Sequence, residues 1–436
     1  MNLLIKNGRV IDPYNKIDDY IDVLVIDGKI SKLSKNITLK DEAKKIASGK
    51  LSDTKKIDAS GKLVCPGFID IHTHLREPGR EDEETIRTGT LAAAHGGFTS
   101  IACMPNTDPV NDNKAVTDYI ISKAKKEGFV NVFPVGSITK KQEGEQLSEI
   151  GELAEAGCVA LSDDGKSVHN SELLRRAMEY AKMFSLPIMS HCEDERLSEN
   201  GVMNEGFVAT ELGMKGIPDI AEDIIVARDI MLSRMTGMHL HLTHISTAGS
   251  VALVRQAKSL GFKVTADVAI HHLILTDDAI RSFDTNYKMK PPLRTQKDID
   301  ALIKGLQDGT IDAIVSDHAP HLLAEKDVEF KNAPFGIIGL ETEVSLALSL
   351  VNKKLLDLKT LIICFTVNPA KILSLDKGTL SVGKDADITI LDLEKEYKVD
   401  AREFKSISKN SPFIGWNFRG KPVMTIVGGK IVTEPD

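Results

Sequence analysis

The stretch GFIDIHTHLREPG, from Gly67 to Gly79, begins as an apolar run and ends on imidazole and guanidinium groups. Such groups are costly to bury unless they have partners. His72 and His74 are two residues apart, so a strand would place both side chains on one face. The stretch therefore predicts a buried strand that ends at a polar site.

Seven more apolar runs follow this one, and helical patterns lie between them. The eight runs span residues 64–74, 98–106, 130–138, 158–165, 187–194, 239–246, 262–270 and 311–320, and clear helical patterns span 113–128, 171–184 and 250–261. Eight strand–helix units over about 300 residues predict a parallel, closed (β/α)8 barrel of the TIM type. A doubly wound open sheet is the alternative, but its usual glycine-rich first turn is missing.

Short alternating segments with glycine turns occupy both ends of the chain. Each piece is small for a core of its own, so we expect the two to pair in one composite β-sandwich domain. The predicted organisation is α/β, with residues 1–64 and 372–436 in the small domain and residues 65–371 in the barrel.

Composition excludes several classes of protein. A net charge of −8 and a pI near 5.9 argue against a general binder of nucleic acid or anionic membrane. The five cysteines form no CxxC pair, which indicates reduced thiols in a cytoplasmic protein. The N-terminus lacks the pattern of a secretion signal, and no apolar run is long enough to span a membrane.

Polar residues gather where the predicted strands end, which is the active-site edge of a parallel barrel. Imidazoles and carboxylates suit Zn²⁺ and similar ions. Four histidines and two aspartates among these residues exceed the three or four ligands of one site, so they predict two metals. One of Asp163 and Asp164 should face the barrel and the other away. The remaining histidines in and between the strands are interpreted as structural. The residues at strand ends are His72, His74, Asn106, Asp163, Asp164, His191, His244, Asp317, His318 and His321.

The motifs PGFIDIHTHLREPG, MPNT, LSDDG, SHCED, LTHIST, KMKPPLR and SDHAPH with APFGIIGLET together resemble the cyclic amidohydrolases, specifically the bacterial type I dihydroorotases. The resemblance covers nearly the whole chain. It implies reversible cyclisation of N-carbamoyl-L-aspartate to L-dihydroorotate in pyrimidine (UMP) biosynthesis. Two alternatives stay open: another cyclic amidohydrolase, such as an allantoinase or dihydropyrimidinase, or an inactive subunit that supports aspartate transcarbamoylase.

The resemblance also implies roles for individual residues. His72, His74 and Asp317 would hold one zinc ion, His191 and His244 the second, and Asp164 would bridge them in place of the carboxylated lysine of hydantoinases. A hydroxide shared by the two zinc ions would attack the ring amide, with Asp317 as proton shuttle. The residues expected to bind substrate are Arg76, Asn106, His321, Phe335 and Gly336.

The assignment of Arg76 also has a basis in the sequence pattern itself, and Lys290 departs from the family pattern. Strand parity puts Arg76 on the same side as the two histidines, where its fork could hold a carboxylate. Lys290 stands where the family usually has Asn, and three readings stay open: it binds the carboxylate, turns to solvent, or marks a changed specificity.

The resemblance further implies a homodimer, with association with aspartate transcarbamoylase as an option. The long segment from His318 to Gly336 lacks helical periodicity, and we expect it to close over substrate.

Overall fold

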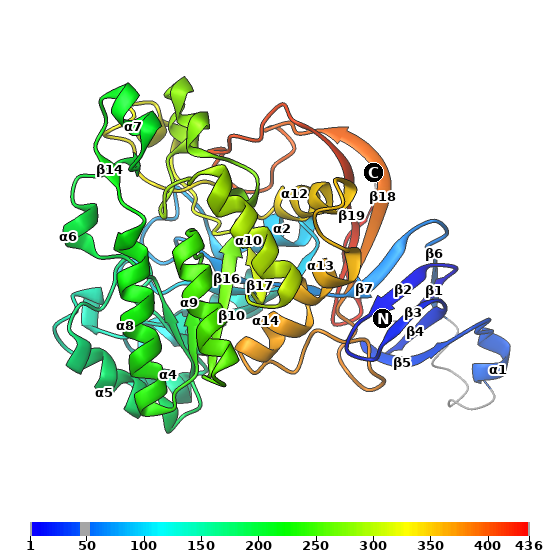
Figure 1. Cartoon of the computed structure of the whole chain (residues 1–436). Helices are drawn as coiled ribbons and strands as arrows, with labels where there is room; N and C mark the ends of the chain where they lie inside the picture. The colour runs from blue at the N-terminus through cyan, green and yellow to red at the C-terminus, as the bar shows by residue number, and fades with distance from the viewer. Residues whose placement is uncertain (1, 44–52, 435–436) are drawn as a thin grey trace.

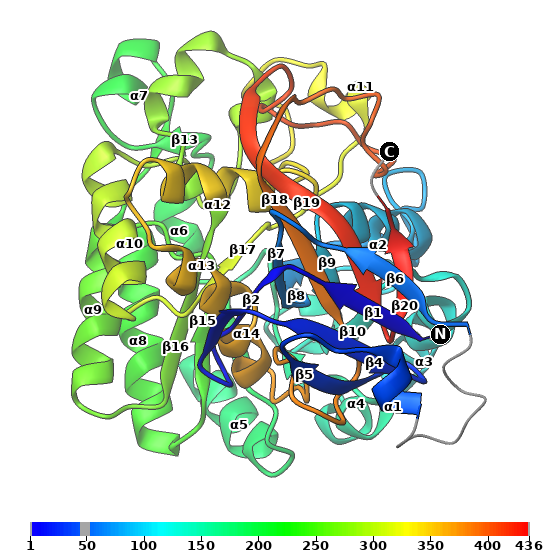
Figure 2. The ribbon, with the colours of Figure 1, turned by 90° about the vertical axis from the view of Figure 1, so that its right-hand side faces the viewer.

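The computed structural model describes residues 2–43 and 53–434 and has two parts (Figure 1). The larger part is a strand barrel wrapped by helices. The smaller part is a pair of β sheets at the side of the barrel, near which both ends of the chain lie (Figure 2). Residues 1, 44–52 and 435–436, which the sequence assigns to the small domain, lie outside the described residues.

The eight predicted strands form one eight-stranded parallel sheet. The strands follow the order of the chain, and a parallel bridge from Thr73 to His318 joins the last strand region to the first. This confirms the predicted barrel. The strands are β8 (Phe68–Thr73), β9 (Phe98–Cys103), β10 (Asn131–Gly136), β11 (Ala160–Leu161), β12 (Ile188–Ser190), β15 (Leu240–Leu242), β16 (Val264–Ala269) and β17 (Ala313–Val315).

Helices that lie between these strands or follow the last of them cover the outside of the barrel, and the three clearest helical patterns are confirmed as α3, α5 and α9. Asn113 and Asn170 begin the first two of these helices, because each side-chain oxygen accepts hydrogen bonds from backbone N–H groups of the first turn. The helices are α2 (Ile86–His95), α3 (Lys114–Glu127), α4 (Ile150–Ala156), α5 (Ser171–Lys182), α8 (Ile220–Thr236), α9 (Ala248–Ser259), α10 (Gln296–Asp308), α12 (Glu343–Asn352), α13 (Leu358–Phe365) and α14 (Val367–Ile372).

Both ends of the chain contribute to the smaller part, as predicted. One sheet has the order β5-β4-β1-β6, and the other has the order β20-β19-β18-β7-β2-β3. A shared apolar core joins Leu3 and Val23 of one sheet to Val64, Ile388 and Ile426 of the other. The strands are β1 (Leu3–Lys6), β2 (Arg9–Asp12), β3 (Ile17–Tyr20), β4 (Asp22–Ile26), β5 (Lys29–Ser34), β6 (Lys55–Asp58), β7 (Leu63–Pro66), β18 (Ile388–Lys398), β19 (Asn417–Val427) and β20 (Lys430–Thr433).

The first apolar run of the sequence, predicted as one strand, is two strands in the structure. Residues Leu63–Pro66 pair with β18 in the small domain, and Phe68–Thr73 belong to the barrel. Gly67 lies between them, where a Cβ atom would sit 2.1 Å from Thr99 Oγ1. Since periodicity reports burial and not the partner strand, it cannot separate the two. The domain limits 1–64, 65–371 and 372–436 stay a prediction.

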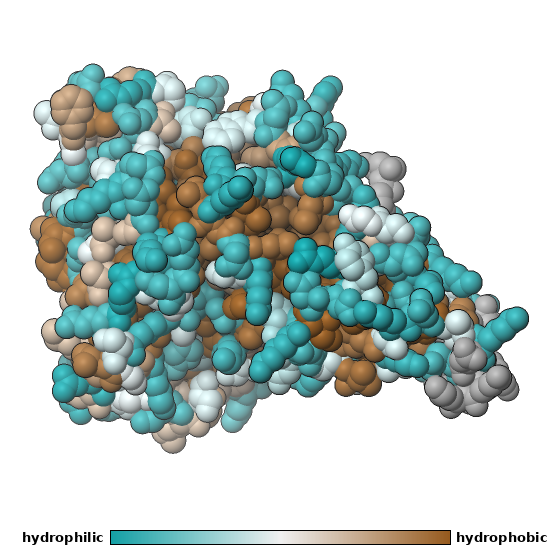
Figure 3. All heavy atoms as spheres, turned by 45° about the vertical axis from the view of Figure 1, so that its right-hand side comes forward, coloured by the Kyte–Doolittle hydropathy of each residue, from teal (hydrophilic) through white to brown (hydrophobic). Residues whose placement is uncertain are grey.

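The surface carries mostly hydrophilic side chains on the face drawn in Figure 3, with hydrophobic residues gathered toward its middle. Within the described ranges, no helix combines the length and the apolar character that crossing a membrane requires. All five cysteines are buried free thiols.

Three phenylalanines pack where the first two barrel strands begin. Phe365 of α13 stacks on Phe68 at 5.3 Å between ring centroids and meets Phe98 edge-on at 5.8 Å. All three side chains are fully buried. This apolar packing lies at the start of β8 and β9, opposite to the polar ends of the same strands.

We predict that Phe365→Ala destabilises the protein by about 3–5 kcal/mol, because it removes a fully buried ring and leaves a cavity. The measurement is the shift of the denaturant midpoint. Phe207→Ala is the matched control: this ring is 78% exposed, so its loss should change stability by less than about 0.5 kcal/mol. Equal shifts would contradict the assignment of Phe365 to the core.

Candidate metal centre

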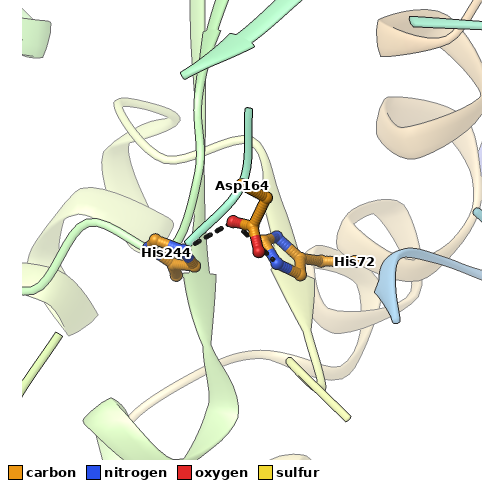
Figure 4. A group of neighbouring side chains, drawn as sticks. All are labelled: His72, Asp164 and His244. Atoms are coloured by element: carbon orange, nitrogen blue, oxygen red, sulfur yellow. Dashed lines mark hydrogen bonds and ion pairs between the residues drawn. The ribbon is translucent and has the colours of Figure 1, made fainter. Parts of the chain in front are cut away.

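Six buried side chains meet at the carboxyl ends of five barrel strands. His72 lies in β8, and each of the others follows a strand by a few residues. Figure 4 shows Asp164 between His72 and His244, with its carboxylate directed at both rings. The six residues are His72, His74, Asp164, His191, His244 and Asp317, the complete set that the sequence analysis predicts as ligands.

Asp164 is the centre of this group. Its Oδ1 lies 3.3 Å from His72 Nε2, 3.4 Å from His244 Nε2 and 3.7 Å from His191 Nδ1. Its Oδ2 lies 3.5 Å from His74 Nε2. One carboxylate thus contacts four imidazoles, as a ligand shared by two ions would.

Asp317 completes a second group on the side of β8. Its Oδ1 lies 3.3 Å from His74 Nε2 and 3.6 Å from His72 Nε2. Two overlapping sets, His72–His74–Asp317 and His72–Asp164–His244, have their donor atoms within 4.8 Å of one another. Two adjacent ions could share this space, since two-metal sites are about 3.5–4 Å apart.

The donor atoms fit a divalent cation. Both ring nitrogens of His72 and Nδ1 of His244 are buried without a hydrogen-bond partner among the described residues. Burial lowers the pKa of His72, but the carboxylates of Asp164 and Asp317 outweigh it and raise this pKa to about 10. The same negative field favours a metal ion, and nitrogen with carboxylate oxygen is the donor set of zinc and related metals.

The two adjacent aspartates face opposite ways, which resolves the alternative that the sequence left open. Asp163 accepts hydrogen bonds from the backbone N–H groups of Ile138 at 2.8 Å and Thr139 at 3.0 Å. It therefore stabilises the turn after β10. Only its neighbour Asp164 contacts the imidazoles.

Three further polar side chains orient the ligands. Asn106 Oδ1 lies 2.8 Å from His74 Nδ1, and Asp267 accepts a hydrogen bond from the backbone N–H of His244. Glu193 Oε2 lies 3.2 Å from His191 Nε2. The contacts of Asn106 and Glu193 with ring nitrogens fix which nitrogen of His74 and His191 faces a metal, whereas Asp267 fixes the backbone of His244.

Glu193, Asp267 and Asp70 were not predicted from the sequence as residues of the site. Asp70 accepts a hydrogen bond from the backbone N–H of His72. Burial raises the pKa of Asp70 to about 7. A usable signal was present in two cases: Asp70 and Asp267 are single carboxylates inside otherwise apolar strand runs. Such residues are rarely buried unless they have a partner.

Arg76 is buried, but strand parity does not place it. β8 ends at Thr73, and Arg76 has a positive φ of 58°, so the alternation of faces stops before this residue. Its Nε donates to the carbonyl of Pro320 at 3.1 Å and lies 3.0 Å from Glu83 Oε2. The parity argument was therefore wrong, although the residue lies in the loop that follows the metal ligands.

The predicted substrate residues His321, Phe335 and Gly336 lie on the segment after β17. His321 Nε2 is 2.8 Å from the carbonyl of Phe335, and the N–H of Gly336 donates to the carbonyl of Lys288. Lys326, in the short helix α11 (Leu323–Lys326), is buried, and its Nζ donates to the carbonyls of Thr285, Lys288 and Pro334. These contacts tie the segment to the neighbouring loop of residues 285–288.

Comparison with known proteins agrees with this geometry. Residues 61–250 match the model of dihydro-orotase-like proteins, and residues 349–433 match that of the amidohydrolase family. The dihydroorotase of Geobacter metallireducens is 57% identical over 432 residues, 99% of both chains. The dihydroorotase of Geotalea daltonii is 55% identical over 436 residues, the whole of both chains.

Solved structures show the same architecture. The L-hydantoinase (dihydropyrimidinase) of Arthrobacter aurescens superposes with a TM-score of 0.86 at 28% identity, over 99% of this chain and 96% of that one. The barrel, its side sheets and the histidine–aspartate cluster define an amidohydrolase. The full-length identity is more specific, and by it the chain belongs to the dihydroorotase family of amidohydrolases.

We predict that Asp164→Asn sharply lowers the metal content of the protein, because it removes the charge that four imidazoles share. The measurement is bound metal per chain after gel filtration, together with the melting temperature. Asp163→Asn is the matched control: it should keep the metal and cost about 1 kcal/mol of stability through weaker hydrogen bonds to the turn. Normal metal content in the Asp164 variant would contradict the shared-ligand assignment.

Proposed function

We propose that this chain is a dihydroorotase that interconverts N-carbamoyl-L-aspartate and L-dihydroorotate in pyrimidine synthesis. The observation that carries the proposal is the position of Asp164 among four imidazoles, in a chain 51–57% identical to proteins named dihydroorotase. All six predicted ligand positions hold residues that can bind a metal, which argues against an inactive subunit. The identity to dihydroorotases over the full chain argues against an allantoinase or dihydropyrimidinase.

The proposed metals are two Zn²⁺ ions per chain. His72, His74 and Asp317 would hold one, His191 and His244 the other, and Asp164 would contact both. Bound zinc supplies Lewis-acid activation of water and of the amide carbonyl near neutral pH. The protein's part is to keep six donor groups buried and oriented.

Asp317 is proposed to move the proton. In hydrolysis its carboxylate takes a proton from the attacking water and passes it to the departing ring nitrogen. In cyclisation the same carboxylate takes the proton from the ureido nitrogen. The contacts of Asp317 Oδ1 with His72 and His74 support this role, because they hold the carboxylate at the metal centre. Burial raises its pKa, but those histidines outweigh burial and hold the pKa well below the usual value.

The substrate carboxylate is assigned to Arg76. Its Nε already contacts Pro320 and Glu83, so the two Nη atoms would bind the substrate carboxylate. Asn106 and His321 would assist Arg76 in binding the substrate. The backbone of Phe335 and Gly336 would face the ring amide, although both groups also have partners within the chain.

The remaining proposals concern the assembly and the cell. The family resemblance supports a homodimer, with association with aspartate transcarbamoylase as the further option. The buried free thiols support a reducing compartment, which we propose to be the cytoplasm.

We predict that Asp317→Asn lowers kcat at least about 100-fold in both directions at saturating zinc, since an amide cannot take the proton. The measurement is the rate of carbamoyl-aspartate and dihydroorotate interconversion, with zinc content determined on the same sample. Asp327→Asn, an exposed aspartate further along the same segment, should keep the parent rate. A parent-like rate for the Asp317 variant would exclude the proposed proton shuttle.

We predict that Arg76→Lys raises KM for both substrates about 10-fold, with a smaller effect on kcat, because a lysine cannot make a bidentate contact with a carboxylate. Arg80→Lys is the matched control, since Arg80 also contacts Glu83 but is not assigned to substrate. Equal KM changes in the two variants would mean that the effect passes through Glu83 and not through a substrate contact.

A further inference from the structure

Lys290 contacts a carboxylate that itself contacts a predicted zinc ligand. The Nζ of Lys290 lies 2.9 Å from Glu193 Oε2, and the same oxygen lies 3.2 Å from His191 Nε2. The other ring nitrogen of His191, Nδ1, lies 3.1 Å from His244 Nε2. Three side chains therefore form a continuous path from a surface pocket to the metal centre.

Glu193 needs a cation at this place. Its side chain is only 8% exposed, and its Oε1 is buried without a hydrogen-bond partner among the described residues. A buried carboxylate is costly unless it is paired. A histidine that binds a metal is neutral, so in the loaded protein the positive charge beside Glu193 is that of Lys290.

A direct role in substrate binding is the competing interpretation. Lys290 lines a surface pocket with Lys288, Lys331 and Phe335, and its Nζ lies 5.6 Å from the centroid of the Phe335 ring. An anionic substrate could approach such a pocket. However, the Lys290 ammonium is already neutralised by Glu193 at 2.9 Å, which leaves it little charge to offer an incoming carboxylate.

We propose that Lys290 is a positioning residue for the metal centre. Through Glu193 it holds the His191 ring with Nε2 toward the carboxylate and Nδ1 toward the metal, and it thereby strengthens zinc binding. Carboxylate partners of this kind fix the tautomer of a ligand histidine and raise its basicity. The inference depends on the proposed function in one respect: it takes His191 as a zinc ligand.

The test is a zinc titration of the metal-free full-length protein, without substrate, against a competing chelator of known affinity. Lys290→Met keeps the length of the side chain and removes its charge, and it should weaken binding of the zinc assigned to His191 and His244 about 10-fold. Lys290→Arg should restore the parent affinity. Glu193→Gln should weaken the same zinc, and the double variant Lys290→Met/Glu193→Gln should be no weaker than Glu193→Gln alone.

The matched control is Lys331→Met, which removes a charge from the same pocket but pairs with Glu329 instead of Glu193. It should leave both zinc affinities unchanged. Unchanged zinc affinity in Lys290→Met with a raised KM for carbamoyl-aspartate would overturn the proposal and make Lys290 a substrate contact. Additive effects in the double variant would also overturn it, because they would mean that Lys290 does not act through Glu193.

Failure of the dihydroorotase assignment and failure of the role proposed for Lys290 would give different results. A parent protein that binds zinc but converts neither substrate would overturn the dihydroorotase assignment. The zinc affinities of the variants would still decide the role of Lys290, because they are measured without turnover.

Discussion

The contact of the Asp164 carboxylate with four imidazoles is the interaction on which the rest of the site depends. Six polar groups are buried at one end of the barrel, and neither the imidazoles nor the carboxylates would be stable there alone. When they lie together, the imidazoles partly compensate the negative charge of the carboxylates, and a divalent cation would compensate it further. The barrel makes this possible because its parallel strands all end at one edge.

The surrounding polar groups follow from the same constraint. Each ligand histidine has a second ring nitrogen or a backbone group that must also be paired. Asn106, Asp267 and Glu193 meet this need for His74, His244 and His191 respectively. Lys290 extends the pattern by one more step, because the carboxylate of Glu193 then needs a cation of its own. The composition of the loops around the mouth is therefore shaped by charge pairing as much as by contact with substrate.

Particular residues show how far sequence reasoning reached. The eight barrel strands, the composite β domain and the gathering of histidines and aspartates at strand ends were predicted from periodicity and spacing. The choice of Asp164 as one of the six ligands came from the family resemblance. The division of one apolar run into two strands at Gly67 was not predicted. The prediction for Arg76 extended strand alternation beyond Thr73, where β8 ends. Both errors have one cause: local periodicity reports burial, but it does not say which strand is the partner or where the strand stops.

The sequence by itself determined the class of fold and the kind of chemistry, because buried runs alternate with helical ones and the ligand residue types stand where those runs end. Only the tertiary structure decided which of Asp163 and Asp164 faces the imidazoles, and what Lys290 contacts. The first depends on how the chain turns after β11, and the second on a pairing between residues almost one hundred positions apart. Neither is encoded in local patterning, since both arise only when the barrel closes and brings the strand ends together.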